Sequence, residues 1–323
     1  MKHKHIANLV FIISLAATLL AQSNEGSPSA ISSDQLAILR WYPANLSTAF
    51  SLANTHNVGP HAVAFDGANI WTANLYDNTV TKVRANDGTI LGTFAVGNAP
   101  IGIAYDGANI WVTNCVSNTV SKVRAGDGVS LGTFPVGNCP LGVTFDGTNV
   151  WVANAAGNTV SKLAAADGTN LGTFTVGTEP VGIAYDGTNV WVANASSNTV
   201  SKLLASDGTI RGTFSVGTHP VGLAFDGRNI WVANSQSNTV SKLLAKSGAR
   251  LGTFSTGSSP QFVAFDGSNI WVTNQASNTV TELRAANGVL LGTFNVGNTP
   301  KGITFDGASI WVANINSGTV SKL

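Results

Sequence analysis

Tryptophan recurs in this chain at a fixed interval of 40 residues, and this interval constrains the fold more than any other feature. The seven copies stand at Trp71, Trp111, Trp151, Trp191, Trp231, Trp271 and Trp311. Each lies in a copy of one segment, which at residues 180–217 reads PVGIAYDGTNVWVANASSNTVSKLLASDGTIRGTFSVG. A repeat of this length with several short strands is typical of a propeller blade. Such a unit cannot bury a core alone, so the copies must stack into one body.

Four short strands are predicted within each copy. In the fourth copy they cover residues 180–185, 190–194, 198–204 and 210–216. Gly182 and Ala184 are small enough for the crowded axis of a propeller, so we place the first strand innermost and the last at the rim. Asp186-Gly187 supplies the turn between the first two strands. The predicted fold class is all-β, a seven-bladed β-propeller of four-stranded blades.

The last copy has only three strands, and a segment near the N-terminus matches the missing fourth. Residues 40–50 align with residues 84–94 at an offset of 44, with the four extra residues in the crossing at 54–57. We therefore predict a propeller over residues 40–323 in which residues 47–52 complete the seventh blade, three strands plus one. This closure ties the two ends of the ring together.

The first 39 residues predict export. Two lysines precede an apolar run at 9–20, and the small residues Ala21 and Ser23 suit a signal peptidase. We expect a signal peptide at 1–23 and a polar linker at 24–39. A retained membrane anchor needs about 20 apolar residues, and the run is only 12 residues long. The protein is expected in the periplasm, outside the cell or on its surface, with no membrane insertion after removal of the signal.

Charge and composition argue against several partners. Only 10% of the residues are charged and the net charge is +1, so no global field attracts nucleic acid or an anionic membrane. Stacking on nucleic acid needs exposed aromatic side chains beside basic ones, and only Tyr76 qualifies. We expect a monomer that binds a protein or glycan, without nucleic acid and without a cofactor.

Residues present in nearly every copy are interpreted as structural. A ring of tryptophans suggests a carbohydrate site, but the second strand of a blade has no solvent face, so packing between blades is favoured. Lysine occupies one third-strand position in six copies, with Glu282 in the remaining one. An anion site is one interpretation of this ring. We favour stems packed on neighbouring blades with the charge reaching solvent.

Loops that differ between copies are predicted at one end of the ring, here called the top face. This face consists of the loops between the second and third strands and the crossings between blades. The candidate ligand-binding residues on it are His61, Tyr76, Asp77, Glu179, His219, Gln236, Gln261, Gln275 and Lys301. Propellers bind ligands near the axis, but exposed loop positions also vary by drift, and both explanations stay open. Phe262 stands where Gly or Ala is usual.

The chain has two cysteines, and both are predicted on the top face. Cys115 lies in a loop of the second copy, and Cys139 lies in the crossing to the third. Export to an oxidising compartment permits a disulfide. We predict a Cys115–Cys139 bond if the two Cα atoms lie within about 7 Å of one another.

Several short motifs resemble the YVTN-type β-propeller repeat. They are Trp111-Val112-Thr113-Asn114, the run SNTVS at 117–121, and Val176-Gly177 followed by Pro180. The resemblance covers all seven copies, with Trp in place of the family's Tyr. It implies an exported surface-layer or periplasmic protein, and many such relatives have no known activity. A more distant resemblance is to the streptogramin lyases, which are also seven-bladed and use a metal ion and a histidine on one face.

Two functions follow from these patterns. The first is a secreted scaffold that binds a ligand on the top face. The alternative is a metal-dependent lyase or hydrolase of the streptogramin-lyase type that uses Glu179 and His219. A Glu with two His, His61 being the second, is a donor set for a divalent metal, but these residues belong to different blades. We found no closely spaced His/Glu pair, Gly-rich phosphate loop or nucleophile elbow, so a protein without catalytic activity is favoured.

Overall fold

The computed structural model describes residues 48–52 and 58–323. The predicted signal peptide and linker, and residues 40–47 and 53–57 of the predicted propeller, lie outside the described residues. Within the described part of the chain, no helix is long and apolar enough to cross a membrane.

The described residues form 28 strands that repeat in four classes. The innermost strands are β2 (Pro60–Phe65), β6 (Pro100–Tyr105), β10 (Pro140–Phe145), β14 (Pro180–Tyr185), β18 (Pro220–Phe225), β22 (Pro260–Phe265) and β26 (Pro300–Phe305). The second strands are β3 (Asn69–Asn74), β7 (Asn109–Asn114), β11 (Asn149–Asn154), β15 (Asn189–Asn194), β19 (Asn229–Asn234), β23 (Asn269–Asn274) and β27 (Ile310–Asn314). The third strands are β4 (Thr79–Arg84), β8 (Thr119–Arg124), β12 (Thr159–Ala164), β16 (Thr199–Leu204), β20 (Thr239–Leu244), β24 (Thr279–Arg284) and β28 (Thr319–Lys322). The rim strands are β5 (Ile90–Ala95), β9 (Ser130–Pro135), β13 (Asn170–Thr175), β17 (Ile210–Ser215), β21 (Arg250–Ser255), β25 (Leu290–Asn295) and β1 (Thr48–Ser51).

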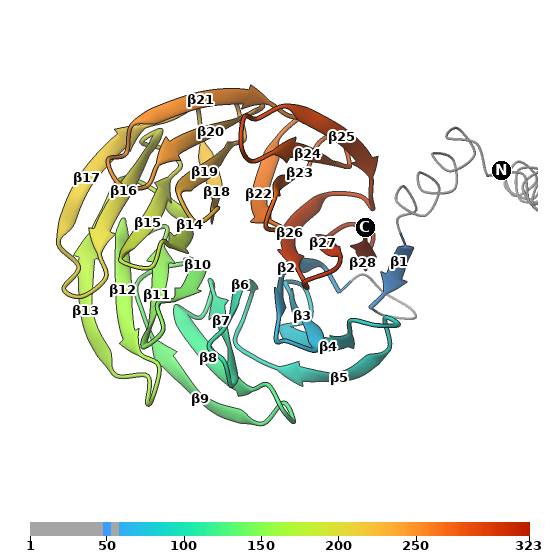
Figure 1. Ribbon diagram of the computed structural model, residues 1–323. Coiled ribbons are helices and arrows are strands. Elements are labelled where there is room, and N and C mark those ends of the chain that lie inside the picture. Colours follow the sequence, from blue (N-terminus) through green and yellow to red (C-terminus); the bar gives the residue numbers. More distant parts are fainter. Residues whose placement is uncertain (1–47, 53–57) are drawn as a thin grey trace, which may run out of the picture. The chain divides into compact units, whose positions relative to one another are not determined.

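These strands make seven antiparallel four-stranded sheets, the blades of a propeller (Figure 1). Six blades are continuous in sequence, and blade 7 has the order β1-β28-β27-β26. In that blade Thr48 lies opposite Lys322 and Ser51 lies opposite Thr319. The predicted fold class is therefore confirmed, including a seventh blade completed by a strand from the N-terminal side.

The repeated tryptophans lie between blades, as predicted. Trp191 is fully buried and packs in one cluster with Ile230 of the next blade. Its indole Nε1 donates a hydrogen bond of 2.8 Å to Asp186 Oδ2, and its ring centroid lies 5.6 Å from that of Phe214. Asp186 Oδ1 also accepts from the N–H of Asn189 at 2.6 Å. The Asp-Gly turn therefore closes the hairpin and orients the tryptophan at the same time.

The lysine ring is structural, but four of its six lysines are buried, whereas we predicted that their charges reach solvent. Lys202 is only 8% exposed. Its Nζ donates to the main-chain carbonyls of Ala245 and Lys246 in the next blade, at 2.7 and 3.3 Å, and lies 5.1 Å from the centroid of the Trp191 ring. The carbonyls of the neighbouring turn replace water around the ammonium, so each such lysine joins two blades. Glu282 instead accepts a hydrogen bond from Asn269 in its own blade.

Candidate functional site

Main-chain hydrogen bonds bring the variable loops together at one end of the blades. The N–H of Ala195 in the β15–β16 loop donates to the carbonyl of Glu179 at 2.8 Å. The equivalent bond in the next blade joins Ser235 to His219 at 2.9 Å. Both Glu179 and His219 have positive φ, and their own N–H groups donate to asparagine side chains of the preceding blade. The crossings are thus held by backbone contacts that leave side-chain identity free to vary.

A cavity of about 270 Å³ lies on the axis, between the inner strands of all seven blades. Its wall is made by residues that follow the first proline of each inner strand. Glycine stands second after this proline in five of the blades. A Cβ on Gly182 would lie 2.1 Å from the carbonyl oxygen of Val221 in the next blade, so glycine permits the inner strands to approach. Around the cavity, side-chain chemistry therefore depends mainly on the first residue after the proline.

That first position divides the ring into two arcs. Four consecutive blades form an apolar arc at Ile101, Leu141, Val181 and Val221, and all four residues line the cavity. The other three blades form a polar arc of Gln261, Lys301 and His61. Lys301 and His61 line the cavity, and Phe262 lines it between Gln261 and Lys301 along the ring. We call this arrangement the channel mouth.

The polar arc is held by contacts across three blades. Lys301 Nζ donates a hydrogen bond of 2.9 Å to Gln261 Oε1, and Gln261 is buried and bonded to Ser259. The His61 ring meets Phe262 edge-on, with centroids 6.3 Å apart, although blade 7 separates their two blades. His61 Nδ1 lies 3.1 Å from the carbonyl oxygen of Ile101. Because a carbonyl only accepts, this contact assigns the ring proton to Nδ1 and leaves Nε2 as an acceptor.

The channel mouth disfavours charge on its own ionisable groups. Burial, and then the nearby charge of Lys301, lower the pKa of His61 to about 3, and the hydrogen bond with Ile101 only partly offsets them. Burial lowers the pKa of Lys301 as well. Both shifts have the same cause, since taking a cation out of water penalises its charged form. His61 is therefore neutral at pH 7 in this protein.

The remaining candidate residues do not join this cavity wall. Tyr76 is exposed and its ring lies over Gly59, while Asp77, Gln236 and Gln275 lie in the loops of their own blades. Glu179 accepts a hydrogen bond from Ser196 of its own blade. Of the nine residues predicted, the structure brings together His61, Gln261 and Lys301.

The residues of the hypothetical metal site are not assembled into one. Residues 48–52 and 58–323 contain no group of three or more His, Cys, Asp or Glu side chains placed to hold a metal ion. Glu179 and His219 stand at equivalent places in neighbouring blades, and their N–H groups donate to two different asparagines, Asn158 and Asn198.

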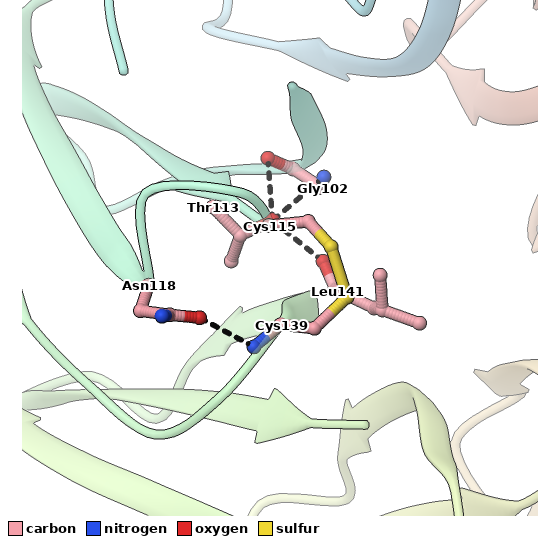
Figure 2. The surroundings of a disulfide bond; sticks show 6 residues. All are labelled: Gly102, Thr113, Cys115, Asn118, Cys139 and Leu141. Atoms are coloured by element: carbon pink, nitrogen blue, oxygen red, sulfur yellow. Dashed lines mark hydrogen bonds between the residues drawn. A yellow bond between two sulfur atoms is a disulfide. The ribbon is translucent and has the colours of Figure 1, made fainter. Parts of the chain in front are cut away.

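The predicted disulfide is present (Figure 2). Cys115 and Cys139 have Cα atoms 4.0 Å apart, which is within the predicted limit. The bond joins the β7–β8 loop to the crossing that leads into β10. Beside it, Thr113 Oγ1 donates to the carbonyl of Leu141 at 2.6 Å. The disulfide therefore fastens two blades next to a residue of the apolar arc, and such a bond fits a protein exported to an oxidising compartment.

Sequence reasoning missed the apolar half of the channel mouth. We selected ionisable and amide side chains from the variable positions and passed over Ile101, Leu141, Val181 and Val221. Phe262 was noted as an irregular residue but not placed in the site. Grouping the first residues after the proline by polarity around the ring would have found both arcs.

The fold agrees with several solved structures of low sequence identity. A streptogramin B lyase is 21% identical, with a TM-score of 0.74 over 86% of this chain and 96% of that one. Virginiamycin B lyase from Staphylococcus aureus is 19% identical, with a TM-score of 0.74 over 86% and 98%. Hydrazine synthase from Kuenenia stuttgartiensis is 20% identical, with a TM-score of 0.72 over 84% and 97%. At these identities the likeness shows the fold alone.

No protein-family model matches the chain, and no curated protein matches it. Membership of the YVTN-type family therefore stays a prediction, while a seven-bladed propeller with streptogramin-lyase-like structural neighbours is established.

Proposed function

We propose that this chain is an exported binding protein whose ligand occupies the channel mouth on the top face. The observation that carries this proposal is the division of the axial cavity into a polar arc with Lys301 and His61 and an apolar arc of four aliphatic residues. Ligand sites combine a mainly apolar wall with a few converging polar groups. The ligand is a small molecule, or a terminal group of a protein or glycan, that enters along the axis.

Export is part of the same proposal. The predicted signal peptide directs the chain to the periplasm, the cell surface or the medium, and the Cys115–Cys139 bond supports an oxidising location. We propose a monomer, because the ring closes on itself through β1 and β28. The net charge is only +1, so the protein has no strong positive field that would favour binding of nucleic acid.

Catalysis by Glu179 and His219 is the alternative function. Its support is the structural similarity of this chain to two lyases. The geometry favours it less, because these side chains lie outside the cavity wall and form no three-donor group with described residues. Metal analysis of the purified protein, with thermal unfolding in EDTA, separates the two functions. A stoichiometric divalent ion whose removal lowers the melting temperature would favour the lyase.

The binding proposal is tested by capture of glycans, exported proteins and small molecules on the immobilised protein. The wild type is compared with a variant in which His61, Glu179, His219 and Lys301 are all alanine. A matched control replaces Arg84, Asp87, Arg124 and Asp127, which form two exposed ion pairs in turns of the opposite face. We expect the first variant to lose a ligand that the control retains. Equal retention by both variants would contradict a top-face site.

A further inference from the structure

The channel mouth holds a cation with little internal compensation. Lys301 is mostly buried, and its Nζ donates one hydrogen bond, to the neutral amide of Gln261. Among residues 48–52 and 58–323, the salt bridges are those of Arg84 and Arg124, so no described carboxylate pairs with Lys301. An ammonium in this position has lost part of its hydration without gaining a counterion. An anionic ligand group would supply that counterion.

His61 provides a second polar contact of a different kind. Its Nδ1 is engaged by the carbonyl of Ile101 at 3.1 Å, so a neutral ring offers Nε2 as an acceptor. Phe262 makes a T-shaped contact with this ring and also lines the cavity. Lys301 is therefore the group of the polar arc that would pair with a carboxylate, because a neutral His61 has no proton on Nε2 to donate.

The apolar arc of the cavity wall determines the chemistry of the uncharged part of the ligand. Ile101, Leu141, Val181 and Val221 present four aliphatic side chains in sequence around the axis, and these residues gain by excluding water against another apolar group. The cavity volume of about 270 Å³ is at or below the lower end of the range for ligand sites, roughly 300–1,000 Å³. This volume admits a short branched chain or a single ring.

From this juxtaposition we infer that the channel mouth binds a small organic carboxylate with an apolar body, its carboxylate on Lys301 and its body against the aliphatic arc. The inference rests on the proposed function and narrows its ligand class. A free acid satisfies both arcs at once, which a neutral hydrocarbon or a bare inorganic anion cannot do.

The test is calorimetric titration of the full protein with 4-methylpentanoate at pH 7 and low salt. The neutral 4-methylpentanamide has the same carbon skeleton and serves as the matched ligand, and acetate serves as the anion without a body. We expect one carboxylate per chain, bound at least about tenfold more tightly than the amide, because a charge-assisted hydrogen bond is lost in the amide. Acetate should bind at least about tenfold more weakly than 4-methylpentanoate, because it lacks four carbon groups of apolar contact.

Two variants tie the binding to the two arcs. Lys301→Met keeps an unbranched side chain of similar length and should weaken the binding of 4-methylpentanoate at least about tenfold. Lys246→Met, at an exposed lysine, is the control and should leave this affinity unchanged. Val181→Thr changes one methyl to a hydroxyl and should weaken the binding of 4-methylpentanoate while leaving the affinity for acetate unchanged. Thermal unfolding of each variant checks that the fold is retained.

Several results would overturn the inference. They are equal binding of acid and amide, full binding by Lys301→Met, acetate binding as tightly as 4-methylpentanoate, or no binding of the acid. If the acid does not bind while the four-alanine variant still loses its captured ligand, the carboxylate class is wrong and the top-face site stands. If neither experiment shows a dependence on the top face, both proposals fail.

Discussion

The seams between blades and the channel mouth are built from the same repeat. Residue identity is nearly constant from copy to copy at the seams, whereas it varies at the channel mouth. At the seams, Trp191 and Asp186 have counterparts in all seven blades, and Lys202 has counterparts in five others. The same indole, carboxylate and ammonium contacts recur from seam to seam. At the channel mouth, the first residue after the proline changes from aliphatic to amide, ammonium and imidazole within one ring.

This difference separates stability from recognition. A contact that every blade needs allows little variation, because each seam must exclude water and satisfy the same buried polar groups. The mouth has no such requirement, since backbone contacts and close packing of the inner strands fix its geometry. Substitutions at the two regions should therefore have different effects, and the following predictions are arranged from the largest to the smallest.

The largest loss is expected at a seam. Trp191→Ala removes a fully buried side chain together with its stack on Phe214 and its bond to Asp186, and should lower the free energy of unfolding by about 3–5 kcal/mol. Guanidinium unfolding measures the change. The mouth substitution Val181→Ala should cost about 1 kcal/mol, and equal losses at the two sites would break the distinction between them.

The disulfide comes next, since it adds stability next to the mouth. Replacing Cys115 and Cys139 by serine opens a loop that spans a sequence separation of 24, and should cost about 2–4 kcal/mol of unfolding free energy. The comparison is unfolding of this variant against the wild type, each with and without reductant. The wild type should lose stability on reduction and the variant should not; a reductant effect of the same size in both would contradict this role.

A smaller loss is expected from one lysine of the seams. Lys202→Met keeps the stem over Trp191 but removes the hydrogen bonds from Nζ to Ala245 and Lys246, and should cost about 1–2 kcal/mol. The exposed Lys246 is the matched control, and Lys246→Met should change stability by about 0.5 kcal/mol or less. Similar values for the two would mean that the ammonium does not join the blades.

The smallest expected change in unfolding free energy depends on pH and comes from His61 at the channel mouth. The pKa of His61 is about 3 in the folded protein and 6.5 in the unfolded chain, so the unfolded chain binds an extra proton between these values. His61 therefore contributes stability above pH 6.5 that is lost as the pH falls toward 3. Between pH 7 and pH 5.5 the wild type should lose about 1 kcal/mol more than His61→Gln. Parallel pH profiles of unfolding free energy would contradict a buried, neutral His61.

The sequence predicted the repeated parts of the molecule better than the singular ones. Blade number, strand positions, the closing strand and the disulfide pair all follow from register, because turn chemistry and alternation are local. The prediction that the lysine charges reach solvent was wrong, because their partners, such as the carbonyl of Ala245, lie 43 residues along the chain in a neighbouring turn. The contact of His61 with Phe262 across blade 7 was out of reach for the same reason, since no local pattern records which side chains meet on the axis.

The most direct test of the central claim is an NMR titration of the isotope-labelled protein with 4-methylpentanoate. Of the eight indole N–H signals, those of the seven repeated tryptophans report on the seams. The amide signals of the residues after each crossing proline report on the mouth. We predict that amides around His61, Val181 and Lys301 shift with ligand while the indole signals stay fixed. Shifts of the indole signals with an unchanged mouth, or no shifts at either region, would contradict the claim that the exceptions to the repeat form the binding site.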